Sequence, residues 1–354
     1  MEKKSLKPEQ DFIARLKKAR SAINSPLPEM GTTKREAVWK KNKSSLWYYA
    51  PKRRKYSIPV FMVYSLINKP VILDLGPGNS LIEAFINEGF DVYLLDFGSP
   101  GYEDSDIDID DYILDYIQPA AKRVLRHSKA RELTVIGYCL GGTIAAMYAA
   151  IAQEPIKNLI LITPPLNFDA LPEFDEWVRA MKEEEVDFTE ILDLLHVVPG
   201  SMVNRGISLM TSPIHSSIYL SLLSNIDNPE YVGKWRRFNE WTIDHVPLTS
   251  AAMKQMLNGL VKDNQLMSRC FNIRGKRTSF KNIAANLLLI AGKGDQLIPE
   301  DMIKPAMDLF ASDDKTYLAL TGGHTTLSKT NGLPEYLDDW LPQRSGPRKA
   351  EKNL

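Results

Sequence analysis

The chain has 354 residues, with 44 Lys and Arg against 44 Asp and Glu, so its formal net charge is zero. A general nucleic-acid binder carries a basic excess, and this class is therefore excluded as the main role. The charged and hydrophobic fractions, 25% and 44%, are ordinary for a globular protein with ample core. The charge is unevenly distributed along the chain. Residues 1–55 hold 16 Lys and Arg against 5 Asp and Glu, a net charge of +11, and the remaining residues therefore carry a net charge of −11.

Residues 1–55 are predicted to form a helix followed by a linker. Phe12, Leu16, Ala19 and Ile23 recur at helical spacing and share one face of a helix that also carries basic residues. Such a face can pack on the protein's own body, or it can dock on a partner or an anionic surface. No secretory signal precedes this helix, and no apolar run is long enough to span a membrane, so any membrane contact is expected to be peripheral.

From residue 56 onward, short apolar runs alternate with helical periods. The runs are 59–66, Val92–Asp96, 133–137, 158–164, 285–292 and 315–320, and we expect each to be a strand buried on both faces. The predicted helices between them include 79–89, 109–128 and 141–153. This alternation predicts an α/β protein with a doubly wound, mostly parallel sheet.

The alternation stops between two of the predicted strands. Residues 169–280 are helical in pattern and include Trp177, Trp235 and Trp241, which favours a helical cap over the carboxyl edge of the sheet. We therefore divide the chain into a basic helix and linker (1–55), a first core part (56–168), a cap (169–280) and a second core part (281–354).

The strongest motif is Gly-Tyr-Cys-Leu-Gly-Gly at residues 137–142, between a predicted strand and a helix of small residues. It matches the nucleophile elbow G-x-S-x-G with Cys139 in place of serine. The helix N-terminus favours a thiolate, and the amide of Leu140 can donate to an oxyanion. The alternative is a glycine-rich turn around a buried, inert cysteine.

The elbow predicts an acid and then a histidine, each in a loop after a late strand. Asp295 follows the predicted strand 285–292, and His324 follows 315–320, so both stand where the motif requires them. We predict a triad of Cys139, Asp295 and His324. The other histidines (His127, His196, His215 and His245) have weaker claims, and Cys270 has no elbow around it and is interpreted as structural.

Two further patterns invite ligand interpretations that we set aside. The run Asp104, Asp106, Asp108, Asp110 and Asp111 lacks the turn glycine of a calcium loop, so we interpret it as acidic residues at a helix N-terminus. The loop 76–80, Gly-Pro-Gly-Asn-Ser, lacks the third glycine of a dinucleotide loop. No Cys/His cluster has zinc spacing, so neither a cofactor nor a metal is expected, and two distant cysteines fit a reducing cytoplasm.

From about Glu36 onward the chain resembles the polyhydroxyalkanoate synthases, in particular the short catalytic subunit of the two-subunit types. The resemblance rests on INKP and ILDLGPGNS at 67–80, FDVYLLDFG at 90–98, GYCLGGT at 137–143, LILITPPLNF at 159–168, WTIDHVP at 241–247, GKGDQLIP at 292–299 and GGH at 322–324. It implies an α/β-hydrolase fold with a helical cap, and an acyltransferase active at polyester granules in the cytoplasm.

Carried over to these positions, the resemblance makes Cys139 the acyl-bearing nucleophile, His324 the base and Asp295 its partner. Ile67 would supply a second oxyanion amide beside Leu140, while Trp241 and Asp244 match a cap motif of unassigned role. The implied partners are 3-hydroxyacyl-coenzyme A, the growing polyester or its granule, and a second synthase subunit, in a homodimer or hetero-oligomer. The thioester is the substrate, so no separate cofactor is implied.

Two other functions remain as alternatives at this point. A cysteine hydrolase of the dienelactone hydrolase or thioesterase kind would use the same triad on water. A non-catalytic granule-binding module would have inherited the elbow from an enzyme ancestor without using it. The intact predicted triad argues against the module, and the large cap argues against a minimal hydrolase.

Overall fold

An eight-stranded sheet forms the centre of the computed structural model, which describes residues 8–171, 175–183, 186–210, 212–268, 270–324 and 332–347. Its strand order is β1-β2-β4-β3-β5-β6-β11-β12. The strands are β1 (Glu36–Lys41), β2 (Ser44–Tyr49), β3 (Val60–Val63), β4 (Val92–Asp96), β5 (Leu133–Tyr138), β6 (Ile156–Ile162), β11 (Asn286–Gly292) and β12 (Lys315–Leu320). The β1–β2 and β2–β4 pairs are antiparallel and the others are parallel, so the predicted mostly parallel α/β sheet is confirmed.

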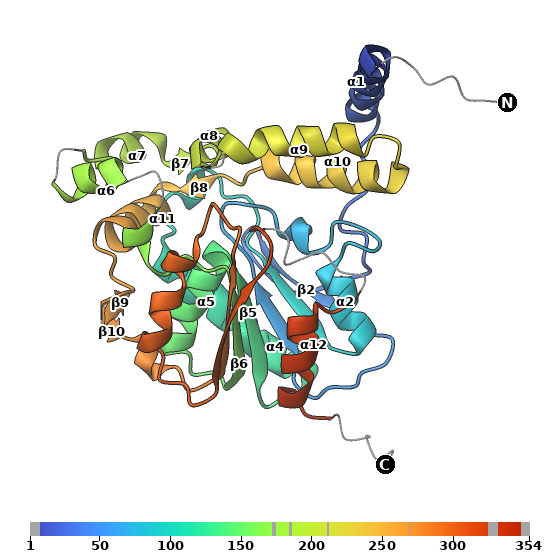
Figure 1. Ribbon diagram of the computed structural model, residues 1–354. Coiled ribbons are helices and arrows are strands. Elements are labelled where there is room, and N and C mark those ends of the chain that lie inside the picture. The colour runs from blue at the N-terminus through green and yellow to red at the C-terminus, as the bar shows by residue number, and fades with distance from the viewer. Residues whose placement is uncertain are drawn as a thin grey trace.

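Helices cover both faces of this sheet (Figure 1). One hydrophobic cluster joins one face to α4 and α5, and a second joins the other face to α2 and α12. These helices are α2 (Leu81–Glu88), α3 (Ile109–Asp111) continuing as a π-helix (Tyr112–Ile117) into α4 (Gln118–Ser128), α5 (Leu140–Ile151) and α12 (Glu335–Trp340). The prediction that all six runs are buried on both faces is wrong for β12, which is only partly buried because it is the last strand of the sheet.

Between β6 and β11 the chain leaves the sheet and forms a cap. Most of its helices lie above the strand ends in Figure 1, whereas its last two strands lie lower, at the side of the core. Its elements are α6 (Asp175–Lys182), α7 (Thr189–Leu195), β7 (Val197–Val198), α8 (Gly200–Met210), α9 (Ser212–Ser224), α10 (Pro229–Ile243), β8 (Leu248–Thr249), α11 (Ser250–Gln255), a π-helix (Met256–Lys262), β9 (Phe271–Ile273) and β10 (Lys276–Thr278). Short 3-10 helices occur at Pro70–Leu73, Tyr102–Asp104, Phe168–Ala170, Phe280–Asn282, Glu300–Met302, Lys304–Leu309 and Pro342–Arg344.

The predicted linker in the basic segment is wrong for residues 36–49, which form the antiparallel hairpin β1–β2. The hairpin extends the sheet through β2, where Trp47 lies opposite Leu94 of β4. Its strands are six residues long and β1 ends in two lysines, so the alternating pattern is too short and too charged to read from sequence. The basic segment is therefore not a unit separate from the sheet.

Helix α1 (Pro8–Asn24) lies beside the cap helices α9 and α10 (Figure 1). Of its predicted apolar face only Ala19 is buried, in a cluster with Trp235, whereas Phe12, Leu16 and Ile23 remain about half exposed. Both interpretations of this face therefore retain support: part of it packs on the protein, and part is available for a partner. Among the described residues, no helix has the length and apolar character needed to cross a bilayer.

Candidate active site

Cys139 lies in the sharp turn between β5 and α5, with a φ of 53° that non-glycine residues rarely adopt. The surrounding glycines make this turn possible. A Cβ on Gly137 would lie 2.5 Å from the Cα of Gly142, and a Cβ on Gly141 would lie 2.5 Å from the carbonyl carbon of Tyr64. The sequence therefore forms a strained elbow that presents Cys139 at the N-terminus of α5, as the motif predicts.

Asp295 and His324 meet in the loops that follow β11 and β12. His324 Nδ1 and Asp295 Oδ2 are 2.7 Å apart, and the other carboxylate oxygen accepts the amides of Leu297 (3.0 Å) and Ile298 (2.9 Å). The Asp295 side chain is fully buried, and that of His324 is 16% exposed. These bonds fix the carboxylate, which in turn orients the imidazole.

The imidazole of His324 also hydrogen-bonds Cys139, so the structure brings the three predicted residues together. Burial by itself would lower the pKa of His324. The negative charges of Cys139 and Asp295, together with hydrogen bonds to both, outweigh burial and raise this pKa to about 10. An imidazole held beside a cysteine sulfur can take up the thiol proton, and the ionised sulfur is the nucleophile in cysteine chemistry.

Tyr138 contributes a contact that the sequence did not reveal. This residue immediately precedes the nucleophile, is buried, and its hydroxyl donates a hydrogen bond to the backbone carbonyl of His324. Its ring stands edge-on to the imidazole, with 5.8 Å between ring centroids. Tyr138 thereby ties the histidine loop to the elbow. The partners are 186 residues apart in sequence, so no local pattern indicates the contact.

The two predicted oxyanion donors follow neighbouring strands of the sheet. Leu140 is the first residue of α5, where helix amides have no acceptor within the helix. Ile67 lies in the loop after β3, which pairs with β5. In this structure the Ile67 amide donates a 3.3 Å hydrogen bond to Ser65 Oγ. Their role as oxyanion donors stays a prediction.

Three of the other histidines lie outside this cluster. His127 Nδ1 is 2.7 Å from the Tyr93 hydroxyl, His196 Nε2 is 2.9 Å from the Tyr102 hydroxyl, and His245 lies in the cap. The side chain of His215 lies outside the described part of the chain. Cys270 accepts a 2.9 Å hydrogen bond from Arg277 Nε and does not join the Cys139 cluster.

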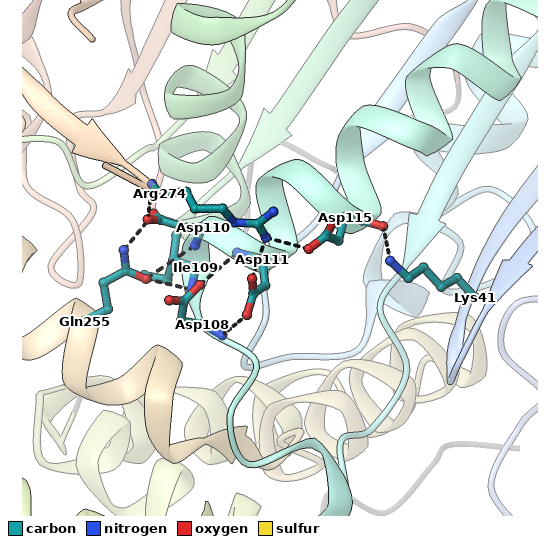
Figure 2. Close-up of polar contacts among 8 residues, drawn as sticks. All are labelled: Lys41, Asp108, Ile109, Asp110, Asp111, Asp115, Gln255 and Arg274. Atoms are coloured by element: carbon teal, nitrogen blue, oxygen red, sulfur yellow. Dashed lines mark hydrogen bonds and ion pairs between the residues drawn. The ribbon is translucent and has the colours of Figure 1, made fainter. Parts of the chain in front are cut away.

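The last three residues of the acidic run lie at a helix N-terminus, as predicted (Figure 2), whereas Asp104 binds Lys43 and the amide of Gly101. The Asp108 carboxylate accepts the amide of Asp111 at 2.8 Å, which closes the N-terminus of α3. Figure 2 also shows Arg274, which lies in the turn between β9 and β10 of the cap, bound to Asp111 and Asp115. Gln255 of α11 binds Asp110 at 2.7 Å. These carboxylates therefore fasten the cap to the core.

Comparison with known proteins bears on the fold and the family of the chain. A family model described as the alpha/beta hydrolase fold matches residues 75–329. The poly(3-hydroxyalkanoate) polymerase subunit PhaC of Haloferax mediterranei is 33% identical, over 89% of this chain and 65% of its own length. The corresponding protein of Haloarcula marismortui is 30% identical, over 90% of this chain and 69% of its own. The chain thus spans about two thirds of the length of these two relatives.

Among solved structures, a thermophilic esterase from Thermogutta terrifontis superposes with a TM-score of 0.51. It covers 88% of this chain at 15% sequence identity, and its whole length is matched. This likeness supports the fold alone.

Proposed function

This chain belongs to the alpha/beta hydrolase fold family and to the poly(3-hydroxyalkanoate) polymerase subunits called PhaC, and we propose that it polymerises 3-hydroxyacyl-coenzyme A into polyester. The observation that carries the proposal is the cysteine at the elbow, joined to a histidine whose Nδ1 lies 2.7 Å from a buried carboxylate. A thiolate exchanges with a thioester at nearly constant free energy. The acyl group on Cys139 therefore stays activated for ester formation, whereas a serine ester would lose that activation.

In the acylation step, the Cys139 thiolate attacks the thioester carbonyl of 3-hydroxyacyl-coenzyme A. The carbonyl oxygen becomes an oxyanion, which the amides of Leu140 and Ile67 stabilise. Collapse of this intermediate breaks the bond to the coenzyme A sulfur, and the imidazolium of His324 protonates the departing thiolate. No cofactor takes part, because the coenzyme A thioester is itself the substrate.

In the elongation step, the 3-hydroxyl of another acyl unit attacks the acyl-cysteine carbonyl. Neutral His324, held in place by Asp295, takes the hydroxyl proton, the new ester bond forms, and Cys139 leaves as a thiolate. Water competes for the same carbonyl, so the site must exclude it. The helical cap above the strand ends is suited to this task.

The proposal includes a second subunit and a site of action at cytoplasmic polyester granules. Support for a contact surface comes from α1, where Phe12, Leu16 and Ile23 are exposed beside the basic Lys17. Replacing Phe12 and Leu16 by Gln should weaken association with the second subunit or the granule without slowing Cys139 alkylation. Unchanged association would assign α1 to the body of the protein alone.

A direct test incubates the protein, with and without its second subunit, with 3-hydroxybutyryl-coenzyme A. Release of coenzyme A together with insoluble polyester supports the synthase, whereas release with free 3-hydroxybutyrate supports a hydrolase. Cys139→Ala should abolish release, and the matched variant Cys270→Ala should retain it. No release from the unaltered protein in either condition, or release by Cys139→Ala, would refute the proposal.

A further inference from the structure

One segment of the cap lies directly against the loop that carries Ile67. We call residues 241–246 the cap strap and residues 64–69 the β3 loop. Trp241 Nε1 donates a 2.9 Å hydrogen bond to the carbonyl of Lys69, and Lys69 Nζ lies 2.5 Å from Asp244 Oδ2. The amide of Val246 donates a 2.9 Å hydrogen bond to the carbonyl of Ile67. Backbone and side-chain bonds thus join the two segments over more than 170 residues of sequence.

The cap strap is itself anchored at both ends. Trp241 is 8% exposed and belongs to the same hydrophobic cluster as Tyr64 and Tyr138, so its ring is buried in the core. After the strap, β8 pairs with β7. The carbonyl of His245 approaches Gly200 so closely that a Cβ there would lie 2.3 Å from the oxygen. The strap is therefore a firm support on which the β3 loop can rest.

The first half of the β3 loop is buried, whereas Ile67, Asn68 and Lys69 are only partly buried and have less support elsewhere. It lines a pocket of about 220 Å³, to which Tyr64, Ser65, Leu66, Asn68 and Lys69 contribute together with Val246 of the strap. A loop beside such a space lacks close packing on that side, and its hydrogen bonds then decide its position. Within the loop, the Ile67 amide has the 3.3 Å bond to Ser65, which is long for a hydrogen bond.

We propose that Trp241 and Asp244 are positioning residues that hold the β3 loop so that the Ile67 amide can donate to the oxyanion. The inference rests on the proposed function, which gives Ile67 this task. Trp241 fixes the backbone at Lys69, Asp244 fixes the Lys69 side chain, and Val246 fixes the peptide that follows Ile67. An oxyanion donor acts only when it is held in advance at the position where charge develops, so a loosened loop slows acylation.

The test uses Trp241→Phe, which keeps an aromatic ring but removes the indole N–H, and Asp244→Ala. Lys69 and Asp244 are 45% and 41% exposed in their side chains, so breaking their pair should leave the fold intact. The matched control is Glu230→Ala, which breaks an exposed ion pair with Lys234 on the same helix α10, away from the β3 loop. Two rates are measured: coenzyme A release in a single turnover with saturating 3-hydroxybutyryl-coenzyme A, and alkylation of Cys139 by iodoacetamide.

We expect each strap variant to slow coenzyme A release about tenfold, since complete loss of one oxyanion donor costs about 10²–10³-fold. Alkylation should stay at the wild-type rate, because it depends on the thiolate and His324 and forms no oxyanion. A double variant with exchanged charges, Lys69→Asp with Asp244→Lys, should recover part of the loss seen in Asp244→Ala. The control should match the wild type in both rates.

Two results would overturn this inference without affecting the proposed function. The first is a wild-type rate of coenzyme A release in both strap variants. The second is an equal fall in the rates of coenzyme A release and of Cys139 alkylation, which would mean that the substitutions affect Cys139 or the fold. Failure of the unaltered protein to release coenzyme A would overturn the proposed function, and the inference with it.

Discussion

Replacing Asp295 by Asn should separate the two steps of the proposed reaction. Two backbone amides, those of Leu297 and Ile298, donate to Asp295 Oδ1. The amide oxygen of Asn must stay there to accept them, so its NH₂ group replaces Oδ2 and faces His324 Nδ1. The NH₂ group of Asn and an Nδ1–H of His324 cannot both donate to each other. The His324 proton must therefore lie on Nε2, toward Cys139. In that tautomer His324 cannot act as a base.

The size of the rate loss in Asp295→Asn depends on which group each step has to deprotonate. In serine proteases the same change lowers kcat by about 10⁴-fold, because a neutral alcohol needs the base. Elongation also deprotonates an alcohol, and its loss should approach that size. Acylation uses Cys139, whose thiol ionises far more easily than an alcohol, so we expect this step to lose only the charge-assisted hydrogen bond between His324 and Asp295. Such a bond is worth about 1.5–3 kcal/mol, which corresponds to about a ten- to two-hundredfold lower rate of acylation.

The assay measures single-turnover coenzyme A release for acylation, and transfer of the acyl group to a hydroxyl acceptor for elongation. The control is Asp313→Asn, which alters an exposed carboxylate in the turn before β12. Equal losses at both steps, or none at either, would show that Asp295 does not control the tautomer of His324 as argued.

Three further predictions concern the elbow and the histidine. Tyr138→Phe removes the hydroxyl bound to the His324 carbonyl and should slow coenzyme A release about three- to tenfold, without lowering the amount of folded protein seen by circular dichroism. Gly141→Ala forces a Cβ against Tyr64 and should lower stability by about 1–3 kcal/mol; an unchanged Tm would contradict this. The pKa of His324 is raised to about 10, so its protonated form stabilises the fold fully below about pH 6.5 and this contribution is lost as pH rises through 10. In chemical denaturation, the stability difference between wild type and His324→Gln should therefore narrow between pH 7 and pH 10, and a constant difference would refute the assignment.

The sequence predicts most directly those residues whose roles are indicated by their immediate neighbours in the chain. Cys139 stands among glycines that only a tight strand-to-helix turn requires, and Asp295 and His324 each follow an apolar strand. The parallel sheet then brings these strand ends to one edge. Local pattern and topology together therefore predict that these three side chains meet at this edge.

Contacts between distant segments could not be read in the same way. The bonds from Tyr138 to His324 and from Trp241 to Lys69 join positions 186 and 172 residues apart. The motif containing Trp241 and Asp244 can be recognised in the sequence, but the contacts that these two residues make depend on how the cap packs on the core. The hairpin β1–β2 was not predicted for a local reason, since β1 ends in lysines and has no buried residue.

The position of the cap strap links catalysis to the state of the cap. The triad residues lie at strand ends and in loops that are joined to each other through Tyr138, and the bonds among them involve no cap residue. The β3 loop, by contrast, shares its hydrogen bonds with Trp241 and Val246. Any movement of α10 that opened a path for substrate or polymer would have to stretch or break these bonds. Under the proposed mechanism the oxyanion site is then complete only when the cap rests on the core, the arrangement that also keeps water from the acyl-cysteine.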